Sequence, residues 1–166
     1  MRKDSDPSWP DYPNTILELF RRPDDAEPAL RVDLRRPVGD ELRRRLAELG
    51  LDGPFGVVTA AAPRGRPQDD DFDRARQAEL DEVARVEAGV DTRRVDGVSP
   101  DGAHRERSVA VRLPKAEVVA LGRRYQQSAV FWFDGDDFWL LGAAAAAEPQ
   151  RLPAGSREPG AEGRPS

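Results

Sequence analysis

Four polar side chains lie beside apolar, strand-like segments, where a polar residue calls for an explanation. They are Thr59, Glu106, Ser108 and Gln127. Their hydroxyl, carboxylate and amide groups donate or accept hydrogen bonds, and a carboxylate can also act as a general acid or base. Strand ends and loops on a rigid scaffold are the usual place for binding and catalytic residues. We therefore take these four residues as candidates for a binding site.

Two arginines, Arg64 and Arg66, follow Thr59 on a proline-rich loop. Guanidinium groups bind carboxylates and phosphates, and the amides at the start of the helix expected from about residue 71 can assist them. The competing interpretation is an internal network, because several aspartates crowd the start of that helix and can neutralise the arginines. Those aspartates are Asp69, Asp70, Asp71 and Asp73. Under the first interpretation, the loop over residues 59–66 binds a small anion.

No complete catalytic set is present in this pattern. His104 and Glu106 are two residues apart, so on a strand they share a face and can form an acid–base pair. The alternative is an exposed pair at the start of a strand. Ser108 lies in no nucleophile-elbow sequence, and no phosphate-binding glycine motif occurs. We expect a non-catalytic binding or accessory domain that uses the loop over residues 59–66. The alternative is an enzyme acting on a small anionic metabolite, with Glu106 as acid or base.

The composition of the chain excludes some kinds of site and disfavours one class of function. The chain has 166 residues, no cysteine and one histidine, so thiolate sites and multi-histidine sites are excluded, and we expect neither a metal nor a cofactor. The net charge is −5, with 26 basic against 31 acidic residues, which disfavours a third hypothesis, a nucleic-acid-binding module. Residues 1–7 are polar, unlike a signal peptide, and no apolar run approaches the roughly 18 residues of a membrane span. We expect a cytoplasmic location, no membrane contact, and a small anionic ligand or a protein as partner.

Proline, glycine and aspartate recur along the chain and predict where the helices and strands that must position these residues begin and end. Residues 1–14 form a flexible arm in which Trp9 and Tyr12 can act as anchors, and residues 148–166 form a disordered tail. Between them, residues 15–147 form one α+β domain. Asp40 is expected to cap the first helix, and Gly50 to end it. Strands are predicted over residues 15–20, 30–35, 55–60, 90–98, 105–113, 129–133 and 138–141, and helices over 40–49, 71–88 and from 114 onward.

The order of these elements predicts the fold class. From Phe55 onward it is strand, helix, strand, strand, helix, strand, which is the split β-α-β pattern of ferredoxin-like folds. The first two strands form an N-terminal hairpin that extends the sheet. We expect a mixed, largely antiparallel sheet with the helices mainly on one face.

Three segments resemble a known family. They are VTAAAPRGRP (residues 58–67), DGAHRERS (101–108) and LGRRYQQSAVFW (121–132). In this order they are similar to a bacterial family, the domain of unknown function 3293, and the resemblance covers residues 55–133. The resemblance implies a shared core and no particular activity. The chain departs from the family's pattern at Ala62 and Asp73, where relatives often carry asparagine, so any site built on those amides is altered here.

Overall fold

Three α-helices and eight short strands make up the part of the chain that the structure, a computed structural model, describes: residues 9–59, 70–88 and 92–153. The helices are α1 (Asp40–Glu48), α2 (Asp70–Ala88) and α3 (Lys115–Arg124), and a 3-10 helix, η1 (Trp9–Asn14), precedes the first strand. The strands are β1 (Ile16–Leu19), β2 (Leu30–Asp33), β3 (Phe55–Thr59), β4 (Thr92–Val98), β5 (Arg105–Val111), β6 (Ala129–Phe133), β7 (Phe138–Gly142) and β8 (Gln150–Arg151).

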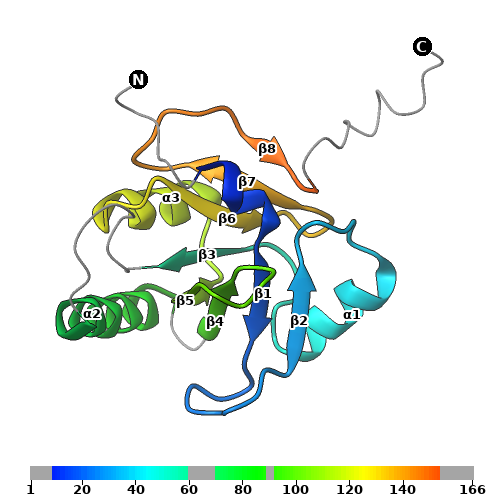
Figure 1. The fold of residues 1–166 in the computed structure, drawn as a ribbon, viewed down its shortest axis with the longest axis horizontal. Coiled ribbons are helices and arrows are strands. Elements are labelled where there is room, and N and C mark those ends of the chain that lie inside the picture. Colours follow the sequence, from blue (N-terminus) through cyan, green and yellow to red (C-terminus); the bar gives the residue numbers. More distant parts are fainter. Residues whose placement is uncertain (1–8, 60–69, 89–91, 154–166) are drawn as a thin grey trace.

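All these strands join one sheet in the order β2-β1-β4-β5-β3-β6-β7-β8, and every neighbouring pair is antiparallel. The predicted α+β architecture with a largely antiparallel sheet is therefore confirmed. The sheet is curled, so that β1 and β2 run in a clearly different direction from β3, β6 and β7 (Figure 1). Because of this curl, strands far apart in the sheet order pack around the same core.

One face of the sheet, which carries Val57, is covered by α1, and we call it the α1 face. Leu46 of α1 is fully buried there among Leu17, Phe55 and Phe133, which come from three different strands. The apolar stripe of α1 explains this packing, since its leucines recur at helical spacing. The curl of the sheet thus closes a core on this side that includes β2 at one end of the sheet and Leu152, directly after β8, at the other.

The ends of α1 agree only in part with the prediction. Gly50 follows the helix with φ +82°, the left-handed conformation that glycine adopts at low cost, so it ends the helix as expected. The predicted cap was wrong: Gly39 is the N-cap residue, and Asp40 is the first residue of the helix. The Asp40 carboxylate instead accepts a hydrogen bond from Arg43 Nη2 at 2.8 Å, because one turn of helix brings the two side chains together.

The opposite face, which we call the α2–α3 face, carries Gly56 and Val58 and packs against both other helices. A Cβ atom at Gly56 would lie 2.2 Å from Cγ1 of Val118, so α3 approaches β3 more closely than any side chain would allow. On the same face, Trp132 and Trp139 stand directly opposite each other in β6 and β7. The two tryptophans therefore pack side by side across the strands, and two of the three described helices lie on this face.

A group of ion pairs links β2, β1, β4 and β5. The buried carboxylate of Glu18 accepts hydrogen bonds from Arg31 Nε at 2.9 Å and from Arg105 Nη1 at 2.8 Å. Arg105 Nη1 also donates to Asp96 at 2.9 Å, and Arg94 donates to both oxygens of Asp96 at 3.1 and 3.0 Å. Two carboxylates that are almost fully buried are therefore each bonded by two arginines, as buried charges require.

The structure moves both predicted ends of the domain. Within the expected tail, Gln150–Arg151 forms β8 against β7, and Leu152 is buried in the core with 2% of its surface exposed. A single large apolar residue reaches a site that the sheet has left open, which outweighs the polar composition around it. At the other end, the predicted arm contains η1, and Tyr12 contacts Phe131 edge to face at 6.4 Å between ring centroids. Tyr12 therefore acts as the expected anchor.

Candidate functional site

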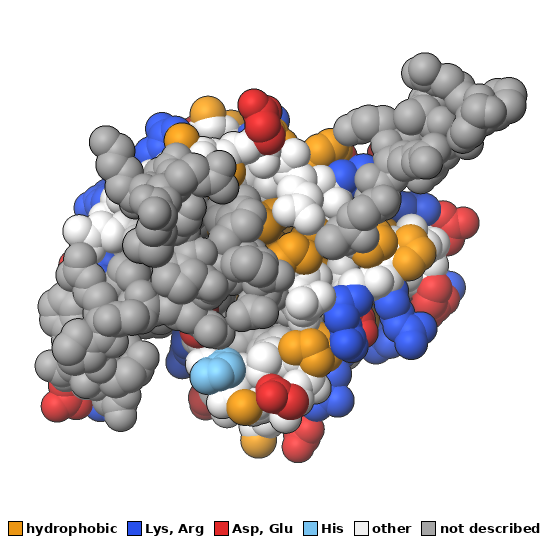
Figure 2. Space-filling view, turned by 45° about the horizontal axis from the view of Figure 1, so that its top comes forward, with side chains coloured by type: hydrophobic (Ala, Val, Ile, Leu, Met, Phe, Trp, Pro, Cys, Tyr) orange, Lys and Arg blue, Asp and Glu red, His pale blue; other side chains and the backbone are white. Residues whose placement is uncertain are grey.

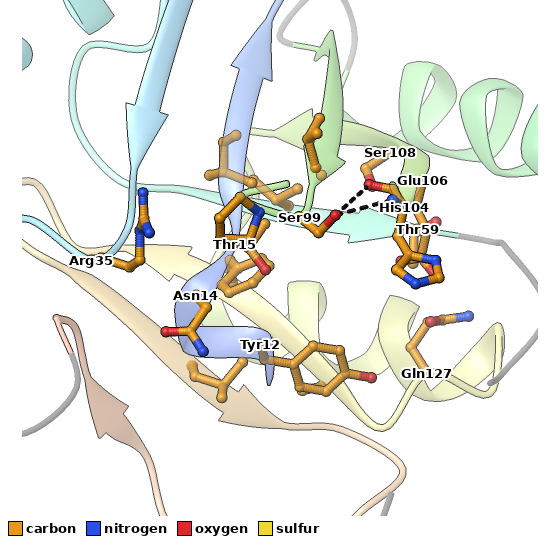
Figure 3. A pocket seen from close by; sticks show the side chains of 18 of the residues that line it. Tyr12, Asn14, Thr15, Arg35, Thr59, Ser99, His104, Glu106, Ser108 and Gln127 are labelled. Atoms are coloured by element: carbon orange, nitrogen blue, oxygen red, sulfur yellow. Dashed lines mark hydrogen bonds between the residues drawn. The ribbon is translucent and has the colours of Figure 1, made fainter. Parts of the chain in front are cut away.

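A cavity of about 630 Å³ opens on the α1 face, where β1, β3, β5 and β6 meet the turn between β4 and β5 (Figure 3). Its apolar lining comes from Leu17, Val57, Phe131 and Leu140, which belong to four different strands. Hydroxyl, amide, carboxylate and imidazole groups complete the lining. These polar residues are Tyr12, Asn14, Thr15, Thr59, Ser99, Asp101, His104, Glu106, Ser108 and Gln127.

Strand alternation places three of the candidates on this face. Thr59, the last residue of β3, pairs with Ser108 of β5, and Glu106 lies two residues further along β5. Because successive side chains of a strand point to opposite faces, Glu106 and Ser108 share the face of Thr59 and Val57. The intervening Arg107 therefore belongs to the other face.

Two of the candidates are held by hydrogen bonds to the backbone. The Thr59 hydroxyl donates to the carbonyl oxygen of Arg107 at 2.8 Å, which bridges β3 and β5 at the end of β3. The amide of Gln127 donates through Nε2 to the carbonyl oxygen of Tyr125 at 3.1 Å, and the side chain is 7% exposed. Gln127 thus holds the junction between α3 and β6, while its side chain also lines the cavity.

Ser108 differs from these two residues. It is 6% exposed and lines the cavity, yet among the described residues its hydroxyl makes no hydrogen bond. A buried hydroxyl without a partner costs free energy, roughly 1–3 kcal/mol, and such groups in folded proteins call for an explanation. A ligand or a water molecule in the cavity would supply the missing bond.

A glycine forms the hollow part of the lining. Gly97 of β4 lies directly opposite Glu106 of β5 and, on its other side, opposite Leu17 of β1. Within the described part of the chain, a Cβ atom at Gly97 would meet only Cγ2 of Thr15, at 3.6 Å, which is an ordinary contact. The backbone does not require glycine here, so its effect is to leave space beside Glu106.

The turn between β4 and β5 forms one rim. The Ser99 hydroxyl donates to Asp101 Oδ1 at 2.7 Å and accepts from the backbone N–H of His104 at 3.0 Å (Figure 3). The hydrogen bond from Ser99, helped by the backbone N–H of Ala103, holds the pKa of Asp101 below its ordinary value. These hydrogen bonds hold the reversal between the two strands and fix the exposed His104 just before β5.

A second rim carries Arg35, which follows β2. Its guanidinium donates to both oxygens of Asp33, from Nε at 2.9 Å and from Nη2 at 2.8 Å. This pairing lowers the pKa of Asp33 and raises that of Arg35, because each charge stabilises the other. In the view of Figure 3, Arg35 lies at the end of the cavity opposite Glu106.

Comparison with known proteins finds one family that matches the segment at the centre of this site. Residues 58–130 match the family described as protein of unknown function (DUF3293). This segment of the chain belongs to the DUF3293 family. No curated protein and no solved structure matches the chain.

The DUF3293 segment contains all four candidates that the structure describes, and the structure brings them to the same cavity. Arg64 and Arg66 lie outside the described residues, as do Asp69 and Ala62, so their expected roles stay predictions.

Sequence reasoning missed the residues that come from outside the DUF3293 segment. Tyr12, Asn14 and Thr15 reach the cavity from η1 and the chain just after it, and Arg35 reaches it from the end of β2. Nothing local in the sequence marks them, because they meet the site only through the curl of the sheet. Gly97 did carry a signal: a lone glycine inside a strand indicates an open or closely approached position.

The described residues include no group of three or more histidine, aspartate or glutamate side chains that could hold a metal ion. Their helices also include none that is long and apolar enough to cross a membrane.

Proposed function

We propose that this DUF3293 protein is a non-catalytic binding domain that holds a small molecule in the cavity of the α1 face. Thr59, Glu106, Ser108 and Gln127 supply its polar contacts. The loop over residues 59–66, which the sequence suggested as the binding edge, begins at Thr59 on the rim of this cavity.

One observation carries the proposal: a cavity of about 630 Å³ joins an apolar lining to a buried hydroxyl that has no hydrogen bond within the described structure. Small-molecule sites commonly occupy about 300–1,000 Å³ and combine apolar walls with a few polar groups that fix orientation. Ser108 is such a group. Its burial reduces the conformational freedom that a ligand would otherwise have to restrict.

The arrangement supports binding better than catalysis. Ser108 lies in β5 and His104 in the turn just before it, so the two are four residues apart, which in extended chain is roughly 13 Å. A histidine at that separation cannot take a proton directly from the serine hydroxyl. The enzyme alternative keeps Glu106 as acid or base, but its anion-binding residues, Arg64 and Arg66, lie outside the described residues.

The nucleic-acid hypothesis gains no support. The first four residues of β3 are buried on both faces, whereas a sheet that binds RNA keeps one face of its central strands open. Acidic and basic side chains are also intermixed on the face of the molecule that Figure 2 shows, which does not resemble a basic groove.

Binding can be tested by a thermal-shift screen of the full-length protein against a library of metabolites. The decisive variant is Gly97→Leu, which extends a side chain into the cavity from a backbone that tolerates it. Gly97→Ala is the matched control, since its Cβ would meet the methyl group of Thr15 at an ordinary distance of 3.6 Å. We expect at least one compound to raise the melting temperature of the wild type and of Gly97→Ala but not that of Gly97→Leu. The absence of any compound with this pattern would overturn the proposal.

We also propose that β3 to β6, with α2 and α3, form a ferredoxin-like unit, and that β1 and β2 extend it as a hairpin. The strand order β4-β5-β3-β6 and the position of both helices on one face support this assignment. A cytoplasmic location and a protein partner stay predictions from the sequence.

A further inference from the structure

We propose that a second surface of this protein, on the face of the sheet opposite the cavity, binds an acidic segment of a partner protein. The surface consists of Arg31, Arg94, Arg105 and Arg107, which belong to β2, β4 and β5, and we call it the arginine patch. It binds an extended segment that carries carboxylates at every second residue. The inference is independent of the proposed function, because none of these arginines lines the cavity.

Cross-strand pairing places the patch on one face of the sheet. Arg107 of β5 lies opposite Asp96 of β4. Glu18 of β1 lies opposite Asp96 on one side and opposite Arg31 of β2 on the other. Residues paired in this way share a face, and Arg107 also shares its face with Val109, two residues further along β5. Because Val109 belongs to the core under α2 and α3, the row lies on the α2–α3 face.

Arginine side chains, rather than a helix, cover this end of the α2–α3 face. α2 packs against β5 and β4, and α3 packs against β3 and β6, whereas β2 lies on the other side of the molecule from both helices (Figure 1). The guanidinium carbon of Arg94 lies 4.0 Å from the centre of the buried Phe20 ring. Arg105 Nη1 covers the two buried carboxylates, 2.8 Å from Glu18 and 2.9 Å from Asp96. The outermost layer here is therefore formed by guanidinium groups.

The patch carries more positive charge than its buried carboxylates neutralise. Its four guanidinium groups lie over two carboxylates, those of Glu18 and Asp96. The side chains of Arg31 and Arg105 stay 66% and 48% exposed while they make these ion pairs. Arg107 is exposed, and its guanidinium makes no hydrogen bond or ion pair in the part of the chain that the structure describes. A chain with a net charge of −5 thus presents a locally positive surface.

Two neighbouring carboxylates do not remove this excess. Asp33, on the same face of β2, is bonded through both oxygens to Arg35, at 2.9 and 2.8 Å. Burial raises the pKa of Asp81 on α2, and the charge of Arg107 acts against that increase, so these two groups lie within electrostatic range of each other. Even with Asp81 ionised, four arginines lie beside three carboxylates. The patch therefore keeps a net positive charge.

The spacing of the arginines matches an extended acidic segment. Three strand spacings separate Arg31 from Arg107, which is roughly 14 Å between their backbones, and the guanidinium of Arg105 lies between them over β1 and β4. In an extended chain, side chains at positions i, i+2 and i+4 also span about 13 Å. Each carboxylate of such a segment can accept charge-assisted hydrogen bonds from one guanidinium. The underlying ion pairs hold Arg31 and Arg105 in place, so binding restricts them less.

Nucleic acid is the other polyanion that a basic surface attracts. Proteins that bind single strands add exposed aromatic rings on which the bases stack. At this patch the ring of Phe20 lies beneath Arg94 and is only 2% exposed, so it offers no face to a base. The observations therefore favour carboxylates on a protein segment over nucleotides.

Fluorescence anisotropy of a short peptide tests the proposal with the full-length protein at low salt. The probe is the peptide GETETETG with blocked ends and a neutral fluorophore, and the comparison peptides are GTTEEETG and GQTQTQTG. We expect the first peptide to bind the wild type more tightly than either comparison peptide. Arg107→Gln and Arg31→Gln should each weaken it about threefold or more, because each removes one charged donor from an end of the row.

Arg112→Gln is the matched control, because it removes the same charge from an exposed arginine outside the patch, which donates to the carbonyl oxygen of Gly50 at 3.4 Å. It should leave the affinity unchanged, and circular dichroism checks that all three variants fold. Absence of binding to the wild type, or equal affinity for the wild type and Arg107→Gln, would overturn the proposal. Equal affinity for GETETETG and GTTEEETG would also overturn it, since the spacing would then select nothing. A labelled oligothymidine that binds more tightly than the peptide and is weakened by Arg107→Gln would assign the patch to nucleic acid instead.

Discussion

Gly97 and Glu106 face each other across the β4–β5 pair, and the missing side chain of one makes the space beside the carboxylate of the other. Among the residues that the structure describes, only Thr15 approaches the open position, at 3.6 Å. A second strand glycine, Gly56, has the opposite surroundings, because α3 lies directly against it. Gly97 therefore leaves a space open, whereas Gly56 allows α3 to pack closely on β3. The same substitution should affect stability differently at the two positions.

Alanine at these two positions should change stability in opposite directions. Gly97→Ala should leave the free energy of unfolding unchanged or raise it by up to about 1 kcal/mol, because alanine loses less conformational entropy on folding. Gly56→Ala should lower it by about 1–3 kcal/mol, because a Cβ would lie 2.2 Å from Val118 Cγ1. Urea denaturation measures both values. If Gly56→Ala were as stable as the wild type, the close packing of α3 on β3 would be wrong.

Removal of Asp96 should destabilise the protein far more than removal of Arg31. Asp96→Ala should cost about 3 kcal/mol, because the Asp96 side chain is 2% exposed and receives hydrogen bonds from both Arg94 and Arg105. Arg31→Ala should cost about 1 kcal/mol or less, because 66% of that side chain is exposed and its ion pair is screened by water. Urea denaturation of the two variants measures both losses in the free energy of unfolding. Similar losses in the two variants would contradict the burial described for this cluster.

Alkaline pH should destabilise the protein through Tyr125. Burial, together with the hydrogen bond from its hydroxyl to Glu79 at 2.9 Å, raises the pKa of Tyr125 from 10.0 to about 12. The folded state therefore favours the neutral phenol. This stabilisation is complete below the unfolded-state pKa of 10.0 and is lost as the pH rises through about 12. Urea denaturation across this pH range should show a steeper loss for the wild type than for Tyr125→Phe, which cannot ionise. Parallel losses in the two proteins would refute the assignment.

The segment after β7 should prove part of the folded core. Leu152→Ala is expected to lower the free energy of unfolding by about 2–4 kcal/mol, because Leu152 is 2% exposed within the core of the α1 face. Val86→Ala removes apolar atoms from a side chain that is 70% exposed, so it should cost no more than about 0.5 kcal/mol. Thermal or urea denaturation measures the difference. A negligible effect of Leu152→Ala would mean that β8 does not dock as described.

The positions of most helices and strands could be predicted from the sequence. Gly50 follows the end of α1, and Pro54 directly precedes β3. Each acts through its own backbone conformation, which affects only a few neighbouring residues. Strand alternation likewise fixed Glu106 and Ser108 on one face before any partner strand was known. The sequence therefore sufficed to group the polar candidates of the DUF3293 segment, since local rules decide which way their side chains point.

Tertiary structure alone decided what surrounds those candidates. The curl of the sheet brings Tyr12 to Phe131 and opens the site that Leu152 fills. These contacts join residues separated by tens of positions, and each depends on the packing of the whole sheet rather than on any neighbouring residues. A polar stretch can therefore still form β8 at the sheet edge, because one buried leucine stabilises it through contacts that its own sequence does not specify.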